Sequence, residues 1–427
     1  MKVKYGFIKA LLPLMLALVL FCVACGQATP TTTTSTTTPT ATTTATTTPT
    51  ATVTAPATIK IGGAIPITGK QSGGGAQVQA GYECAVELIN KAGGVFVKEY
   101  NKKIPFELIL RDDASDFNKT ISQLETLYSQ DKVIAYLGSF SSGICVPSCS
   151  MGEKNKIPWL GISFAAMAPH EQGYKYVFAP FPKSPDYIDV FASYSDQSDK
   201  PTKAALWIEQ SDWGIEMTNV WTAAAAKYGF TVVYNKTYAV GTTDFSSLIL
   251  GAKSAGADMV LGIPTGPDAT AMVKQMKQLD YAPKFVCLIR GPDMNTWAGV
   301  AEGNYVVEMP AWHSNCKFTG VDAINAWHQQ KYGRPADVLV GPAYTCVQIL
   351  ANAIERAGTL NPSDIRDAIA TTNMDTAMGK MSFNAKNTGI CESIIMTQWQ
   401  NGKIECVWPA KHASAKLVYP FPAWTGR

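Results

Sequence analysis

The sequence is poor in the residues on which most metal-dependent, catalytic and nucleic-acid-binding sites depend. Its 427 residues include only four histidines, and no two of them have the i, i+4 spacing of a zinc-binding helix. No run of five Lys or Arg residues occurs, and the formal net charge is only +3, so the chain lacks the basic surface that nucleic acid would need. We therefore expect no metal, no cofactor and no nucleic-acid partner.

Glycine-rich catalytic signatures are missing as well. The loop 138–143 (GSFSSG) does not match the G-x-S-x-G elbow of serine hydrolases, because the residue two positions after Gly138 is Phe140. The glycines at 73–75 fit neither a P-loop nor a dinucleotide-binding motif. The sequence thus predicts a protein that is not an enzyme.

The first 24 residues have the layout of a secretory signal peptide. Three lysines within the first nine residues precede an apolar run over 10–24, which is too short for a stable membrane span. Cys25 follows small residues and precedes Gly26, as in a bacterial lipoprotein, so we expect cleavage before Cys25 and lipidation of its thiol. An uncleaved anchor is the alternative. Since the three lysines account for the whole net charge, the mature chain would be balanced.

Residues 25–58 form a predicted linker behind the lipidated cysteine. Between residues 28 and 58 the chain is almost entirely Thr, Pro and Ala, without a charged or aromatic residue, so it cannot bury a core. We expect an extended stalk that holds a globular body away from a membrane.

From Ile59 onward, short aliphatic runs alternate with helical periods. This alternation predicts an α/β fold with two doubly wound parallel-sheet lobes, whose ligands bind beyond the carboxyl ends of the strands. Asn401-Gly402 also predicts a hairpin over 396–408. Strands are expected at 59–67, 105–113, 133–139, 157–163, 204–210, 231–238, 258–264 and 284–290, and helices at 77–91, 118–130, after Gly143, 215–228, 245–255, 267–279 and 342–357.

Three candidate ligand contacts lie where a predicted strand gives way to a helix. In the loop 138–143, free backbone N–H groups and the hydroxyls of Ser141 and Ser142 suit a carboxylate, although these serines would equally serve as helix caps. Trp213 follows the strand 204–210, with surface packing as the alternative. Asp268 begins a helix, where it would simply complement the helix dipole.

A series of ordered motifs resembles one known family, the type I periplasmic solute-binding proteins of the leucine/isoleucine/valine-binding group. The resemblance covers nearly all of 59–408 and depends on the order and spacing of the motifs together. The motifs are IPITG (65–69), AVELINKAGG (85–94), RDDASD (111–116), LGSFSSG (137–143), GISFAAMAP (161–169), DWG (212–214) and the helix that begins at Pro267-Asp268.

The resemblance implies a two-lobed clamp whose chain crosses between the lobes three times. The crossings are expected near Pro180, Arg290 and Ser382. Lobe 1 would then comprise 59–180 plus 291–382, and lobe 2 would comprise 181–290 plus 383–427.

The resemblance also implies a set of ligand contacts. Ser142 would bind the ligand carboxylate, Trp213 would cover the ligand, and Asp268 would receive its ammonium group. Met167 replaces a hydroxyl residue of amino-acid binders but keeps its backbone N–H, and the glycines at 73–75 replace a tyrosine, which predicts a roomier pocket. An aromatic or branched acid, an amide or urea therefore competes with an amino acid as the ligand. The full set of implied contacts is Phe140, Ser141, Ser142, Ala165, Met167, Trp213 and Asp268.

The ten cysteines favour an oxidising compartment. Family members often join the positions of Ser115 and Ser141 by a disulfide, which both serines rule out here. Either of Cys145 and Cys149, one helical turn apart, would reach Cys84, and buried free thiols are the alternative. The pairing of the eight cysteines after Cys25 stays open; they lie at 84, 145, 149, 287, 316, 346, 391 and 406.

Together these features predict an exported, monomeric, lipid-anchored protein, either periplasmic or at the cell surface. It would deliver a small carboxylate-bearing ligand, an amino acid or a related acid, to the permease and ATPase subunits of an ABC importer. The alternative is a surface sensory receptor that uses the same clamp without transport.

Overall fold

The structure is a computed structural model that describes residues 54–194, 199–239, 241–392 and 394–425. All of them belong to one compact unit, Val53–Arg427. The signal peptide, Cys25 and nearly all of the linker lie outside the described residues, so cleavage, lipidation and the stalk stay predictions.

The first of two large sheets is entirely parallel and contains five strands in the order β4-β1-β5-β6-β7. Strand order departs from chain order because helices connect the strands, as the predicted βα alternation requires. The strands are β1 (Ile59–Ile65), β4 (Phe106–Asp112), β5 (Tyr136–Leu137), β6 (Trp159–Leu160) and β7 (Val177–Phe178).

The second large sheet contains seven strands in the order β17-β16-β12-β11-β10-β8-β9. Its first five strands along the chain run parallel, and β16 and β17 form the predicted antiparallel hairpin. Asn401 and Gly402, with φ of 51° and 76°, make its turn. The strands are β8 (Lys203–Glu209), β9 (Thr231–Tyr238), β10 (Met259–Gly262), β11 (Phe285–Leu288), β12 (Val307–Glu308), β16 (Met396–Gln400) and β17 (Lys403–Trp408).

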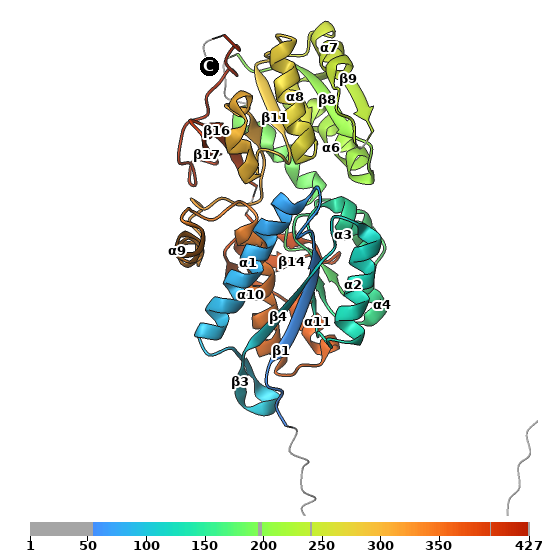
Figure 1. Cartoon of the computed structure of the whole chain (residues 1–427), viewed down its shortest axis with the longest axis vertical. Helices are drawn as coiled ribbons and strands as arrows, with labels where there is room; N and C mark the ends of the chain where they lie inside the picture. Colours follow the sequence, from blue (N-terminus) through green and yellow to red (C-terminus); the bar gives the residue numbers. More distant parts are fainter. Residues whose placement is uncertain (1–53, 195–198, 240, 393, 426–427) are drawn as a thin grey trace, which may run out of the picture. The chain divides into compact units, whose positions relative to one another are not determined.

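Helices cover both faces of each sheet. In Figure 1, α1 and α10 lie on one side of β1 and β4, and α2 to α4 lie on the other. In the second sheet, alternate residues of β8 pack on α6 on one face and on α7 and α8 on the other. The helices are α1 (Ser72–Lys91), α2 (Phe117–Ser129), α3 (Ser142–Ser148), α4 (Ser150–Asn155), α5 (Ala168–Glu171), α6 (Asp212–Tyr228), α7 (Ser246–Ser254), α8 (Gly266–Gln278), α9 (Val321–Tyr332), α10 (Val340–Ala357) and α11 (Pro362–Ala370).

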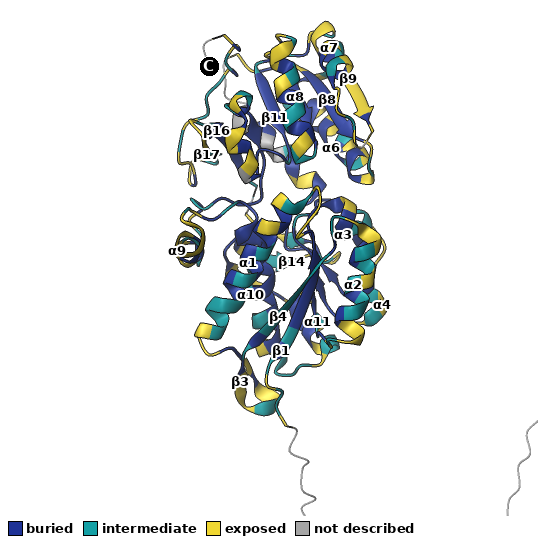
Figure 2. Cartoon of the chain, in the orientation of Figure 1, coloured by how far each residue is buried: buried dark blue, intermediate teal, exposed yellow. Residues whose placement is uncertain are grey.

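Smaller elements connect these layers. None of the described helices is both long and apolar enough to cross a membrane. Figure 2 shows the inner strands of the large sheets buried, whereas the edge strand β9 and the outer faces of the helices carry exposed residues. The small elements are the strands β2 (Val95–Val97) and β3 (Lys102–Ile104), the strands β13 (Asn373–Thr376), β14 (Gly379–Phe383) and β15 (Gly389–Ile390), and the 3-10 segments η1 (Lys98–Tyr100), η2 (Ser184–Tyr194), η3 (Asn295–Gly299) and η4 (Ala301–Gly303).

We call each large sheet with the helices packed on it a lobe. Two of the expected crossings come too early for the observed pairing. Because Val307 of β12 pairs with Cys287, the chain stays with the second sheet well beyond Arg290. Likewise, the bridge between Ala179 and Thr388 keeps the chain at the first sheet beyond Ser382. At both points the chain pairs with its sheet through only a few residues, without a long aliphatic run. The sequence therefore gave little indication of where the chain leaves each sheet.

Candidate ligand-binding site

A cavity of about 480 Å³, part of it open solvent, is lined by residues of both lobes. Most of these residues lie at or just beyond the carboxyl end of a strand, which is where parallel α/β sheets bind their ligands. Arg290 also lines two neighbouring cavities, so it lies at the centre of the hollowed region. Five of the seven expected contacts line the first cavity: Phe140, Ser141, Ser142, Ala165 and Trp213.

The wall from the first lobe consists of neutral side chains after β5 and β6. Ser141 has φ 74° and ψ 151°, a backbone conformation that is otherwise essentially restricted to glycine. Although Ser141 is the N-cap residue of α3, its side chain makes no capping hydrogen bond. The hydroxyls of Ser141 and of Ser163, which also has a positive φ of 57°, are buried without a partner among the described residues. Helix capping therefore does not explain Ser141.

The glycines at 73–75 allow close packing, and because Gly73 and Gly74 also line a cavity beside the first one, the roomier pocket stays a prediction. They lie in the first turn of α1, where a Cβ on Gly74 would come within 2.5 Å of the Phe140 ring. A Cβ on Gly75 would come within 2.0 Å of the Pro66 carbonyl oxygen. The missing side chains thus let α1 approach the loop after β5.

Trp213 forms a large part of the wall from the second lobe. It is the second residue of α6 rather than a loop residue, because the Ser211 hydroxyl caps the helix by accepting a hydrogen bond from Gly214 N (3.1 Å). Its indole is buried, and Nε1 has no partner among the described residues. The guanidinium carbon of Arg290 lies 4.8 Å from the centroid of the ring, a cation–π arrangement.

Arg290 is held in place by the second lobe. Its Nη2 donates to Glu209 Oε2 and to the Ile263 carbonyl oxygen, both at 2.8 Å. The two charged side chains are only 16% and 9% exposed, so this is a largely buried ion pair. Arg290 also has a positive φ of 74°, and within the described chain its Nε has no hydrogen-bond partner.

Two buried carboxyls and a phenol complete the wall beside Arg290. Asp293 Oδ1 accepts from Gly291 N (2.7 Å), and Glu308 Oε1 accepts from Arg290 N (3.2 Å). Burial raises the pKa of Asp293 to about 6, and burial together with the neighbouring Asp293 raises the pKa of Glu308. The pKa of Tyr187 is raised by burial and then by Glu308. None of these three residues was predicted from the sequence, because no local motif marks them.

Asp268 does not line this cavity. Its carboxyl Oδ2 accepts from Thr265 N (3.3 Å), and its own N–H donates to Thr265 Oγ1 (3.4 Å), which makes a capping box at the start of α8. Burial raises the pKa of Asp268 above its usual value. This geometry is the helix-terminal role that the sequence left as the alternative.

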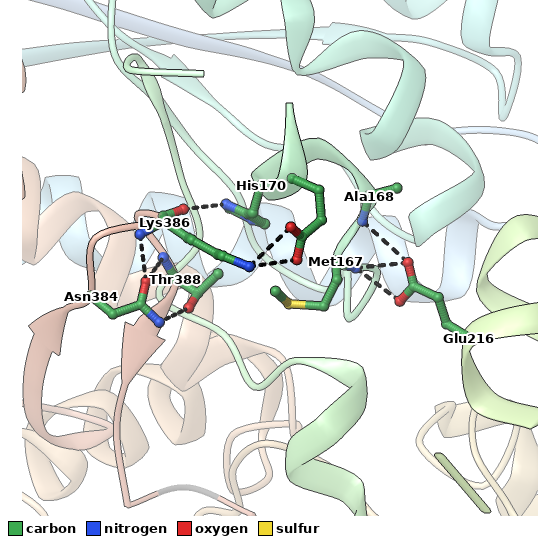
Figure 3. Close-up of polar contacts among 8 residues, drawn as sticks. Met167, Ala168, His170, Glu216, Asn384, Lys386 and Thr388 are labelled. Atoms are coloured by element: carbon green, nitrogen blue, oxygen red, sulfur yellow. Dashed lines mark hydrogen bonds and ion pairs between the residues drawn. The ribbon is translucent and has the colours of Figure 1, made fainter. Parts of the chain in front are cut away.

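Met167 lies away from the first cavity and lines a separate groove. Its backbone N–H, expected to remain available to a ligand, donates to the Glu216 carboxylate of α6 at 2.8 and 3.0 Å (Figure 3). Glu216 also accepts from Ala168 N (3.1 Å) and from Ser184 Oγ (2.8 Å). One carboxylate of the second lobe therefore holds a loop of the first. In the same view, His170 Nδ1 contacts the Lys386 carbonyl oxygen at 2.9 Å.

The eight described cysteines are free thiols, and all but Cys391 are buried. Burial raises the pKa of Cys149 to about 12, which makes it unreactive as a thiolate. Of the two alternatives for the cysteines, the structure therefore favours buried thiols.

A family model described as periplasmic binding protein matches residues 58–403. The chain belongs to that family. Membership confirms the predicted family and places the chain among proteins that work outside the cytoplasm. Because such proteins bind solutes without transforming them, it also confirms that the chain is not an enzyme.

Curated relatives match most of the chain. Leu/Ile/Val-binding protein homolog 7 of Brucella abortus is 27% identical over 384 residues, covering 85% of this chain and 94% of that protein. Homolog 1 of the same organism is 27% identical over 351 residues, covering 81% of this chain and 91% of that protein.

Solved structures confirm the two-lobed α/β fold class. A leucine-binding protein of Thermotoga maritima superposes with a TM-score of 0.73 at 20% identity, covering 82% of this chain and 97% of that one. A branched-chain amino acid binding protein of Streptococcus pneumoniae, in complex with isoleucine, gives 0.73 at 22% identity, covering 85% and 100%. A solute-binding protein of R. palustris, in complex with benzoate, gives 0.71 at 17% identity, covering 84% and 98%.

Proposed function

We propose that this protein is the extracytoplasmic receptor of an ABC importer and binds a small carboxylate-bearing solute, an amino acid or a related acid, between its lobes. One observation carries the proposal: four buried polar atoms without a partner among the described residues belong to residues that line one cavity. They are Ser141 Oγ, Ser163 Oγ, Trp213 Nε1 and Arg290 Nε. Each unpaired buried polar group costs roughly 1–3 kcal/mol, which a polar ligand would recover.

The chemistry of these atoms supports a ligand with an acceptor group. The indole and guanidinium N–H groups can only donate, and the serine hydroxyls can donate as well. A carboxylate would accept from several of them together with the backbone N–H groups at Ser142. The aromatic rings of Phe140, Phe181 and Trp213 would cover the apolar body of the ligand.

Similar proteins support the same ligand class. The curated relatives are named as leucine, isoleucine and valine binders, and two structural neighbours hold isoleucine and benzoate. Export by the signal peptide over 1–24, anchoring through a lipid on Cys25 and handover to separate permease and ATPase subunits complete the proposed role.

Direct binding measurements test this function. Isothermal titration with amino acids, aromatic acids, amides and urea should find at least one carboxylate that binds with micromolar or tighter affinity. The variant Ser142→Ala should weaken the binding of that ligand. Ser150→Ala on α4, outside the cavity, is the matched control and should leave the affinity unchanged. If no carboxylate binds even at millimolar concentration, or if a plain amide binds instead, the proposal is wrong.

A further inference from the structure

We propose that Glu216 is a latch between the two lobes. Its carboxylate holds the loop 165–168 of the first lobe on the second lobe and so favours the closed arrangement, in which both lobes line the ligand cavity. Glu216 is a positioning residue, because it does not itself line that cavity. The inference concerns how the lobes stay together, so it does not depend on which solute the protein binds.

The carboxylate of Glu216 makes four hydrogen bonds outside its own helix. Oε2 accepts from Met167 N at 2.8 Å, and Oε1 accepts from the same N–H at 3.0 Å (Figure 3). Oε1 also accepts from Ala168 N at 3.1 Å, and Oε2 accepts from Ser184 Oγ at 2.8 Å. Hydrogen bonds to an ionised carboxylate are stronger than those between neutral groups. One side chain of α6 therefore binds two backbone groups of the first lobe and a hydroxyl at the first crossing.

The two backbone N–H groups depend on the other lobe for a partner. Met167 and Ala168 begin α5, and the first N–H groups of a helix have no acceptor within it. Met167 is the N-cap residue of α5, yet its side chain makes no capping hydrogen bond. Glu216 supplies the cap instead. When the lobes separate, these N–H groups and the carboxylate must exchange each other for water, so opening breaks the latch.

Apolar packing seats the same loop on the second lobe. Ala165 and Ala166 are 4% and 1% exposed, and both belong to the buried cluster that contains Ile208 and Met217 of the second lobe. The Ala165 carbonyl oxygen also accepts from the backbone N of Ser184 at 2.8 Å and from its Oγ at 3.0 Å. The latch is thus the charged part of a larger contact between the lobes.

The latch is connected to the ligand cavity through both of its partners. Trp213 lines the cavity and lies one turn before Glu216 on α6, and Ala165 lines it and lies two residues before Met167. Holding the loop on α6 therefore keeps these two parts of the cavity wall together. A solute that needs both walls binds with an apparent affinity that rises with the population of the closed arrangement.

Small-angle X-ray scattering of the full chain, without added solute, tests the latch directly. Glu216→Gln removes the charge and replaces one acceptor oxygen by an amide nitrogen that can only donate, so the variant should have a larger radius of gyration than the unaltered protein. Glu171→Gln is the matched control, because Glu171 lies on α5 but forms an exposed ion pair with Lys386. Its radius should equal that of the unaltered protein. Equal radii for Glu216→Gln and the unaltered protein would overturn the inference.

Titration calorimetry with L-leucine and with benzoate measures the effect on binding. Glu216→Gln should weaken both by the same factor, because the latch acts on the lobes and not on the solute. Glu216 is only half-buried, so water competes for its hydrogen bonds and we expect a factor of roughly 3 to 10. Stopped-flow mixing should place this loss in the dissociation rate. Glu171→Gln should leave both affinities within about twofold. Unchanged affinity in Glu216→Gln, or a loss for one ligand and not for the other, contradicts the latch.

Hydrogen exchange on the unaltered protein covers the case in which Glu216→Gln does not fold. Saturating L-leucine should slow the exchange of the Met167 and Ala168 amides, because binding holds the lobes closed and keeps both N–H groups on Glu216. The amide of Gly161 is the control, since it donates to the Phe178 carbonyl oxygen within the first lobe at 2.7 Å and should keep its rate. If the Met167 and Ala168 amides exchange equally fast with and without L-leucine bound, the inference is wrong.

The outcomes also separate the latch from the proposed function. The radius of gyration is measured without a solute, so it decides on the latch even if neither L-leucine nor benzoate binds. Failure of the wider panel of carboxylates overturns the proposed function and leaves the scattering result valid. Conversely, tight binding of a carboxylate with no difference in radius between Glu216→Gln and the unaltered protein overturns the latch alone.

Discussion

The two walls of the cavity differ in chemistry. The first lobe contributes neutral groups, chiefly Phe140 and the hydroxyls of Ser141 and Ser163, whereas the second lobe contributes Trp213 and all the charged side chains that line the cavity. Hydroxyls and backbone N–H groups bind many kinds of polar ligand. Buried charges discriminate strongly between ligands, because a buried charge that the ligand does not match is costly. From this difference we expect that the donors of both walls bind the polar group of the ligand, and that the buried charges of the second lobe decide which solute binds.

The largest expected effect comes from breaking the ion pair of the charged wall. Arg290→Met leaves Glu209 buried without its partner, so we expect a loss of about 3 kcal/mol in the free energy of unfolding. Urea unfolding measures this loss. The double variant with Glu209→Gln should recover part of it, because no buried charge then remains unpaired. A double variant as unstable as Arg290→Met would contradict the account of the pair.

The next effect tests the aromatic part of the same wall. Trp213→Ala removes the buried indole and the face on which Arg290 lies, and it should weaken every carboxylate ligand by roughly 10- to 100-fold. Titration calorimetry gives the affinities, and Trp213→Phe, which keeps an aromatic ring, should lose less. If only the binding of amino acids were weakened, Trp213 would contact the ammonium group, and the roles assigned here to the two walls would be wrong.

The dependence of ligand affinity on pH distinguishes the charged wall from the neutral wall, and this effect is expected to be smaller than that of Trp213→Ala. The pKa of Asp293 is raised to about 6, so its carboxyl takes up a proton as the pH falls through 6. Affinity for an amino acid should then fall, by up to about tenfold per pH unit below 6, whereas affinity for the 2-hydroxy acid of the same skeleton, which lacks the ammonium, should change little. The charged and titratable groups that face Asp293 are Arg290, Glu308, Tyr187 and Asp337.

This titration reports the neighbouring carboxyls Asp293 and Glu308, because burial raises the pKa of both. Among the described residues that line the cavity, none is a histidine, so no imidazole titrates there near pH 6. Parallel pH profiles for the two ligand types would show that the ammonium does not meet Asp293.

The smallest expected effect concerns Asp268, which contributes to the second lobe but not to the cavity. Asp268→Asn weakens the capping box of α8 and should lower the free energy of unfolding by about 0.5–1 kcal/mol. Ligand affinity should stay within about twofold. Calorimetric melting measures the stability and titration measures the ligand affinity. A large loss of affinity for amino acids would show that Asp268 does contact the ammonium group.

The same contrast between walls explains what the sequence could predict. Phe140, Ser141 and Ser142 follow one strand in one continuous loop, so a local motif was enough to find them. Asp293 and Glu308 come from two segments that become neighbours only when β12 pairs beside β11. Asp268 was chosen because it begins a helix after a strand, a position that local patterns cannot distinguish from a ligand contact.

Most helices and strands could be predicted from the sequence, and the differences between predicted and observed bounds have physical causes. The strand β9 was predicted at its observed bounds, from a stretch rich in β-branched and aromatic residues. In contrast, α1 begins five residues before the predicted start at Gln77, since the glycines at 73–75 have poor helix propensity. Close packing of Gly74 on Phe140 favours the helix there, and a contact so distant in sequence leaves no local signal.

Ser141, Ser163 and Arg290 share a left-handed backbone without being glycine. Each conformation costs on the order of 1 kcal/mol or more, which glycine would largely avoid. A programme of thermostabilisation guided by backbone geometry alone would therefore include these three positions among its targets. Glycine at Ser141 and Ser163 would yield a protein that melts later and has lost two hydroxyls that the fold holds in place before any solute arrives. At Arg290 the loss of the buried pair with Glu209 would outweigh the gain in backbone freedom.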